Sequence, residues 1–195
     1  MSRRRFIFDP PDRFVAGALG EPGQRTFFLQ AAKGGAVVSV ALEKVQVALL
    51  AERIGELIEG LTRRGVEVAP AREAVLGSWP AARATIGPVA PTLQEPVVEA
   101  FRVGPMTLAW DEDRRDLVLE AREIGDGDEP EADDGTTDPD FARHVMRVRI
   151  GLAEARTFAE EAMAVVAGGR PPCPICGEPL EPQGHICLRR NGYVQ

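Results

Sequence analysis

The end of the chain carries the pattern that most limits how it can fold. All three cysteines lie between residues 173 and 187, where Cys173 and Cys176 form a Cys-x-x-Cys turn and His185 and Cys187 follow after a short loop. Two thiolates in one tight turn, completed by a third thiolate and an imidazole, are the ligand set and spacing of a tetrahedral zinc site. Since protein atoms fill all four positions and none is left for water, we expect one structural Zn²⁺ here.

Other interpretations of these cysteines stay open. A redox dithiol, unrelated cysteines or an iron–sulfur cluster would each use part of the set, but a redox pair needs no third cysteine and histidine close behind it. The tail, residues 170–195, has few large apolar residues, so we expect the metal to supply most of its stability. Arg189 or Arg190 would offset the negative charge of the three thiolates.

Upstream of the tail, residues 1–169 are expected to form one α+β body. Short runs of β-branched and aromatic residues, bounded by Gly and Pro, predict strands at 4–9, 13–19, 26–31 and 36–40, with a Pro-Pro turn between the first two. From Leu42 onward the apolar residues recur every three or four positions, which predicts an amphipathic helix packed on the sheet. These residues are Val45, Leu49, Leu50, Ile54, Leu57, Ile58 and Leu61.

The same order of elements is predicted again in the second half. Residues 66–96 are punctuated by Pro and Gly, which predicts a connector with one short helix at 71–76. Strands are predicted after it at 97–103, 106–110, 116–123 and 143–150. A helix follows directly, with one apolar face made of Leu152, Ala155, Phe158, Ala159, Ala162, Met163 and Val166.

The two halves also align weakly with each other. Residues 25–31 match 115–121, and the passage from strand to helix at 38–42 matches 148–152. We infer a duplicated strand-strand-strand-helix unit, with antiparallel strands and with the helices on one face. The expected repeats span about 4–65 and about 97–169.

An acidic insertion lengthens the second repeat. Residues 125–140 are rich in Asp and Glu and hold no apolar side chain larger than alanine, so they have nothing to bury. We therefore expect a mobile, solvated loop. A calcium loop is the functional alternative, but its ligand spacing is absent.

Composition narrows the classes of function. A net charge of −7 and a pI near 5.0 work against loose binding to nucleic acid, which needs a concentrated basic surface. No apolar run reaches the roughly 18 residues that span a bilayer. The basic N-terminus meets Asp9-Pro10-Pro11 too soon to be an export signal. We therefore expect a cytoplasmic protein that has no membrane contact.

Motifs of catalysis are missing from the sequence. It has no phosphate-binding loop, no nucleophile elbow and no dinucleotide fingerprint. His144, the one histidine outside the tail, begins an arginine-rich strand and is expected at the surface. An enzyme would have to use dispersed carboxylates, such as Asp9, Asp12 or Glu99, in a pocket between the repeats.

The tail and the N-terminus together carry a resemblance to a known family. The tail reads Cys-Pro-x-Cys-Gly-x-Pro-Leu-x-Pro-x-Gly-His-x-Cys, then Arg-x-Asn-Gly-Tyr at 189–193, and residues 8–14 read Phe-Asp-Pro-Pro-Asp-Arg-Phe. Over its whole length the chain resembles a conserved actinobacterial family of unknown function. In that family a proline usually follows the last cysteine, where this chain has Leu188. The resemblance implies an actinobacterial origin, the cytoplasm and the zinc tail, but no activity.

Three functions are weighed on these grounds. The leading one is a non-enzymatic binding or adaptor protein, whose zinc tail docks a partner protein or orders the C-terminus. The second is a nucleic-acid-associated factor, in which Arg189, Arg190 and Tyr193 contact phosphate and a base. The third is an enzyme with its pocket between the repeats.

Overall fold

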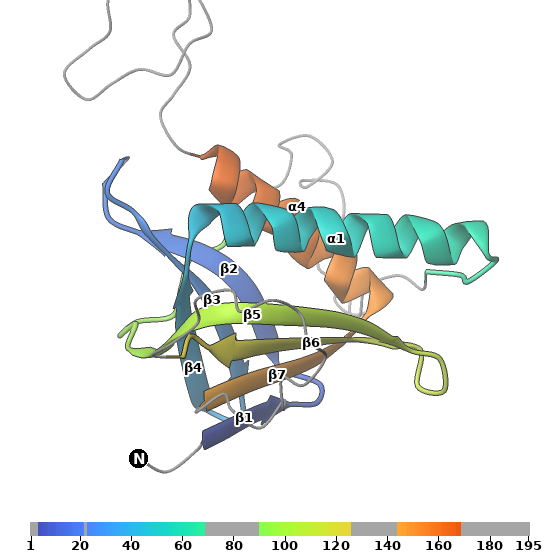
Figure 1. Ribbon diagram of the computed structural model, residues 1–195, viewed down its shortest axis with the longest axis horizontal. Coiled ribbons are helices and arrows are strands. Elements are labelled where there is room, and N and C mark those ends of the chain that lie inside the picture. The colour runs from blue at the N-terminus through green and yellow to red at the C-terminus, as the bar shows by residue number, and fades with distance from the viewer. Residues whose placement is uncertain (1–3, 22, 69–89, 126–143, 169–195) are drawn as a thin grey trace, which may run out of the picture.

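The described residues of this computed structural model, 4–21, 23–68, 90–125 and 144–168, form an α+β fold, as predicted. Within them the chain builds one mixed sheet and two helices (Figure 1). The strands are β1 (Arg4–Phe8), β2 (Arg13–Leu19), β3 (Thr26–Lys33), β4 (Ala36–Leu42), β5 (Glu99–Asp111), β6 (Asp116–Glu123) and β7 (His144–Gly151). The helices are α1 (Lys44–Arg63) and α4 (Leu152–Ala167).

The sheet has seven strands in the order β1-β7-β6-β5-β4-β3-β2. The segments β2-β3-β4-α1 and β5-β6-β7-α4 each hold three antiparallel strands and then a helix, and β4 pairs with β5 in parallel. The expected antiparallel sheet is therefore a mixed one. That these segments arose by duplication remains a prediction.

β1 lies far in the sheet from the strand that follows it in the sequence. The predicted meander across a Pro-Pro turn is wrong, because β1 pairs in parallel with β7 and β2 pairs with β3. The four residues that connect the end of β1 to the start of β2 span at most roughly 18 Å. The edges of a flat seven-stranded sheet would be roughly 29 Å apart. The sheet must curl so that its two edges approach each other, and Lys33 Nζ donates to the backbone oxygen of Asp9 across the gap.

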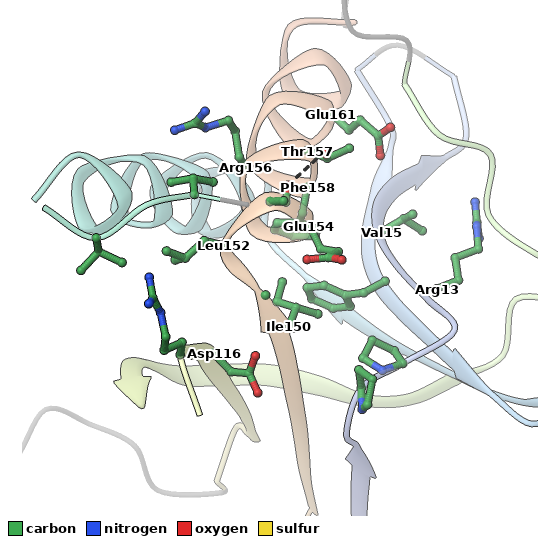
Figure 2. A pocket seen from close by; sticks show the side chains of 18 of the residues that line it. Arg13, Val15, Asp116, Ile150, Leu152, Glu154, Arg156, Thr157, Phe158 and Glu161 are labelled. Atoms are coloured by element: carbon green, nitrogen blue, oxygen red, sulfur yellow. Dashed lines mark hydrogen bonds between the residues drawn. The ribbon is translucent and has the colours of Figure 1, made fainter. Parts of the chain in front are cut away.

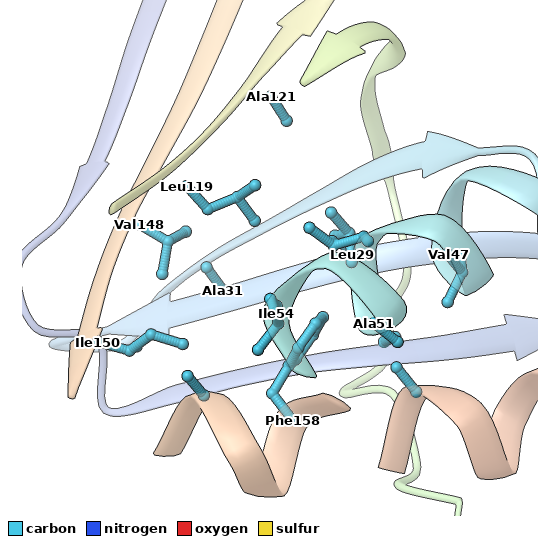
Figure 3. Packing of buried hydrophobic residues seen from close by; sticks show 14 of the residues in the cluster. Leu29, Ala31, Val47, Ala51, Ile54, Leu119, Ala121, Val148, Ile150 and Phe158 are labelled. Carbon is cyan, nitrogen blue, oxygen red and sulfur yellow. The ribbon is translucent and has the colours of Figure 1, made fainter. Parts of the chain in front are cut away.

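Both helices cover the inner face of this curled sheet (Figure 1). Figure 3 shows Ile54 of α1 and Phe158 of α4 packed toward Leu29, Leu119 and Val148 of the strands. Every second residue of a strand points inward, so one alternating apolar set from each strand enters this core. Gln46 fixes the start of α1, since its Oε1 accepts from the Glu43 N–H at 2.8 Å and its Nε2 donates to Gly104 O at 3.0 Å.

The outer face of β2-β3-β4 is covered by residues from the predicted connector. Leu93 is buried there with Val15, Phe28 and Ala41. A Cβ added at Gly17 would lie 2.5 Å from Cγ of Leu93, so the glycine makes room for this side chain. The connector is therefore part of the packed body at this point.

Two local predictions differ from the structure. Residues 97–103 and 106–110 were predicted as separate strands, yet β5 runs through both with an irregular register between Val103 and Met106. Pro105 lies inside this irregularity, and it has no N–H to give to a ladder. On α1, Val45 and Leu49 belong to the predicted apolar face but are 70% and 49% exposed, because the buried stripe runs through Val47, Leu50, Ala51, Ile54, Ile58 and Leu61.

Several predicted features lie outside the described residues: the short helix at 71–76, nearly all of the acidic loop at 125–140, and the tail at 170–195. Within the described part of the chain, neither helix is long and apolar enough to cross a membrane.

Candidate functional site

An open groove lies at one end of the body, where the N-terminal half of α4 faces the start of β2 (Figure 2). Its volume is about 1710 Å³. Five stretches far apart in the sequence line it: the turn from β1 into β2, the residues after α1, Pro91, the start of β6, and the passage from β7 into α4. The curl of the sheet brings these stretches together.

The groove meets only the start of β2, where Arg13, Phe14 and Val15 line it. Beyond them Ala16 and Gly17 are buried, so the groove does not continue along the strand. Its floor is apolar, because the ring of Phe14 stacks on that of Phe158 with 4.5 Å between centroids.

The first turns of α4 form the opposite wall. Figure 2 shows Glu154 and Glu161 on the side of α4 that faces β2. Glu154 lies back over the start of its helix, since a Cβ at Gly151 would be 2.6 Å from Glu154 Oε2. A carboxylate in the first turn complements the positive end of the helix dipole.

Several charged groups around the groove already have partners within the protein. Arg13 Nη1 donates to Gln30 Oε1 at 3.2 Å, and its Nη2 donates to Thr92 O. The carboxylate of Asp12 accepts from the Gly34 N–H at 2.7 Å. These contacts fix the wall of the groove.

Behind the groove, five charged side chains form an ion-pair network. Arg149 Nη1 lies 2.6 Å from Asp111 Oδ2, and Arg114 makes a two-pronged contact with Asp9 at 2.9 and 3.0 Å. Asp116, which lines the groove, is 3.7 Å from Arg114 and 4.0 Å from Arg149. The hydrogen bond from Arg149, helped by the Arg114 N–H, holds the pKa of Asp111 below its usual value. The same bond raises the pKa of Arg149.

The dispersed carboxylates considered for an enzyme lie in three different places. Asp12 lines the groove and Asp9 lies in the network behind it. Glu99 is exposed on β5 and pairs in register with Ser39 of β4, away from the groove. The predicted zinc ligands and Arg189, Arg190 and Tyr193 lie outside the described residues. Within the residues that are described, no group of three or more metal-binding side chains occurs.

His144 is more enclosed than the sequence suggested. Its side chain is 18% exposed, its Nδ1 lies 2.6 Å from Glu123 Oε2, and its ring lies beside those of Phe6 and Phe101. His144 is therefore partly exposed at the surface, but it lies against a carboxylate and two aromatic rings. In the register of β6 and β7, Arg122 pairs with Val145, so Glu123 lies opposite His144. No local pattern in the sequence indicates how these two strands are aligned.

Comparison with known proteins gives one match. The model of a family described as "Protein of unknown function (DUF3090)" matches residues 6–187. This chain belongs to that family. The match covers the body, the groove and the four predicted zinc ligands. Neither the curated proteins nor the solved structures gave a match.

Proposed function

We propose that this chain is a binding or adaptor protein that meets a partner polypeptide in the groove between β2 and α4. The main support for this proposal is the size and the lining of the groove. Sites for small molecules usually enclose about 300 to 1,000 Å³, whereas this one holds about 1710 Å³ and is open to solvent. An apolar floor with a charged rim is the anatomy of a protein interface.

The chemistry of the lining favours binding over catalysis. Neither histidine nor cysteine is among the described residues that line the groove. Of its carboxylates, Asp12 is held by a backbone N–H and Asp116 lies beside two arginines. A general base needs a carboxylate or imidazole within reach of a substrate proton and poised to accept it. Stable pairing leaves Asp12 and Asp116 to shape the site, and the other acidic residues of the lining, Glu67, Glu154 and Glu161, have no imidazole or thiol beside them among the described lining residues.

A matched pair of variants tests the groove. Thr157 is half-buried on the groove side of α4, and Glu160 is exposed on the same helix outside the groove. Thr157→Trp should fill the groove with an indole, while Glu160→Trp adds the same bulk elsewhere. We expect the wild type and Glu160→Trp to recover the same partner from a cell extract, and Thr157→Trp to lose it while still melting cooperatively.

Two other outcomes of this recovery experiment are informative. Equal recovery of all proteins by the three forms would contradict a role for the groove. Recovery that is sensitive to nuclease, and that is lost in Arg189→Ala/Arg190→Ala, would instead support the nucleic-acid alternative.

The zinc tail is the second part of the proposal. Cys173, Cys176, His185 and Cys187 would hold one structural Zn²⁺, and the support is their ligand type and spacing. Elemental analysis of the purified full chain should find about one zinc per chain, and none in Cys173→Ser/Cys176→Ser. A wild type that carries iron or no metal would overturn this part and leave the groove untouched.

A further inference from the structure

The outer side of the two helices carries large apolar side chains that the body leaves uncovered. Val45 is 70% exposed and Leu49, one turn further along α1, is 49% exposed, while Met163 of α4 is 40% exposed. Val45 and Leu49 lie four residues apart, so they share one side of their helix. Of the seven large apolar side chains that are exposed in the described residues, these three lie on the helices. The apolar side of α1 is therefore wider than the sheet and α4 can cover.

The tail leaves the body at the end where Val45 lies. Gly168 directly follows α4, and Arg25 Nη1 donates to its backbone oxygen at 2.5 Å, which fixes the point of departure. Arg25 stands two residues before Phe27, which pairs with Leu42, the last residue of β4. Since α1 begins two residues after Leu42, its start and the end of α4 lie at the same end of the body, as Figure 1 shows.

The tail has apolar side chains that its own length cannot bury. These are Ile175, Leu180, Ile186, Leu188 and Tyr193. A segment of about 25 residues builds almost no hydrophobic core, and four ligands around an ion enclose the ion and not these side chains. The tail and the outer side of the helices each leave apolar surface in water, and contact between them removes both surfaces from water.

The link between α4 and the predicted zinc site is short. The five residues from Gly168 to Cys173 span at most roughly 18 Å. Met163 lies five residues before Gly168, or roughly 8 Å along the helix, and the axes of packed helices are roughly 8 to 10 Å apart. The tail is thus held beside the exposed side chains at an effective concentration on the order of millimolar.

The charges beside the exposed apolar residues also fit the tail. Glu52, on the next turn of α1, is exposed, and no ion pair engages it among the described residues. Further along the helix, Glu56 is already paired with Arg53 at 2.8 Å. The tail carries Arg189 and Arg190, which can meet the carboxylate of Glu52.

We propose that the zinc-bound tail folds back on the outer side of the helices and covers Val45, Leu49 and Met163. This inference rests on the zinc part of the proposed function, and it adds the place where the tail lies. Arg25 fixes the root of the tail, apolar contact holds it, and its arginines orient it. The groove, at the other end of α4, stays open to its partner.

A matched pair of variants of the full, zinc-loaded chain tests this contact. Val45→Glu puts a charge into the covered surface. Ile7→Glu puts the same charge at a 62% exposed position on the outer face of β1, which the helices do not cover. Both variants should fold, because both positions are exposed, and a carboxylate in the first turn of α1 favours the helix dipole.

Nitrogen-15 relaxation of the backbone amides shows whether the tail tumbles with the body. In the wild type and in Ile7→Glu we expect residues 173–188 to share the correlation time of the body. In Val45→Glu the undocked fraction should rise at least about tenfold, because burial of a valine is worth more than about that factor in an equilibrium constant. A wild-type tail that holds zinc but tumbles independently would overturn the inference and leave the zinc site standing.

A photoreactive residue in place of Met163 identifies what covers this surface. We expect crosslinks to residues 173–193 of the same chain in dilute solution, reduced severalfold when Val45→Glu is added. Crosslinks between two copies would assign the surface to a dimer, and their absence from the tail would likewise overturn the proposal. A wild type without zinc would instead defeat the zinc part of the proposed function, and this inference with it. The groove keeps its own test in Thr157→Trp.

Discussion

The outer faces of the two halves of the sheet differ in how they meet water: one is covered by other residues and the other is open. Gln30 and Glu120 each lie on the outer face of the middle strand of three, one on β3 and one on β6. Gln30 is 1% exposed and bonds Ser39 Oγ, Gln94 N and Gln94 O at 2.8 to 3.0 Å. The Glu120 side chain is 24% exposed and lies 3.2 Å from Arg122 and 3.5 Å from Arg147.

This difference follows from what covers each face. Residues 91–94 remove water from the centre of the outer face of β2-β3-β4, so Gln30 there is fully hydrogen-bonded, and the one charged neighbour, Arg13, donates to Gln30 and to Thr92 O. On the outer face of β5-β6-β7, water still reaches Glu120, so charges are tolerated and pair with arginines. A covered face stabilises the fold through packing, whereas an open face carries solvated charges that contribute little to stability.

The most direct test of this difference exchanges the side chains of the two positions, a neutral amide on β3 and a carboxylate on β6. Gln30→Glu removes the donor to Ser39 and Gln94 and puts a carboxylate at a 1% exposed position, where Arg13 Nη1, 3.2 Å from Gln30 Oε1, offsets only part of the cost. We expect it to lower the free energy of unfolding by about 3 kcal/mol at pH 7, against less than about 1 kcal/mol for Glu120→Gln. Urea unfolding measures both. Equal losses would show that the faces do not differ in this way.

The contact between Gly17 and Leu93 allows a double-mutant cycle. Gly17→Ala places a Cβ against Leu93, and we expect it to lower the free energy of unfolding by about 2 kcal/mol in the wild type. In a Leu93→Ala background the space is open, so the same substitution should cost almost nothing. Leu49→Ala, at a half-exposed position of α1, controls for the loss of an isobutyl group. Additive losses would mean that Leu93 is not seated on this face.

The smallest effect concerns the network beside the open face. Because Arg149 lowers the pKa of Asp111 in the fold from a usual value near 3.8, ionised Asp111 stabilises the folded state. This contribution is complete above the unfolded pKa and is lost as the pH falls through the folded one. Unfolding curves of the wild type and Asp111→Asn should therefore differ by a small constant amount between pH 5 and 8 and converge below about pH 3.8. A difference that grows in acid would reverse the assigned sign.

The sequence supports the prediction of elements better than that of their arrangement. Hydrophobic periodicity is local, so most strands and both helices were predicted close to their bounds. The place of β1 beside β7 depends on residues nearly a chain length apart, and nothing in Arg4–Phe8 indicates its partner. For the same reason the role of Leu93 and the pair of Glu123 with His144 were missed.

The groove is the clearest case of this limit. Its lining comes from five separate stretches, and only the curl of the sheet brings them together. The proposed zinc ligands, by contrast, occupy one short stretch whose spacing alone carries the prediction.

Amide hydrogen exchange of the full chain, with and without the partner recovered through the groove, tests the central claim most directly. The account predicts slower exchange on binding in residues 13–19 of β2 and 152–161 of α4, with little change in residues 116–122 of β6. Slower exchange in β6 and β7, with β2 and the start of α4 unchanged, would contradict it and move the binding surface to the open charged face.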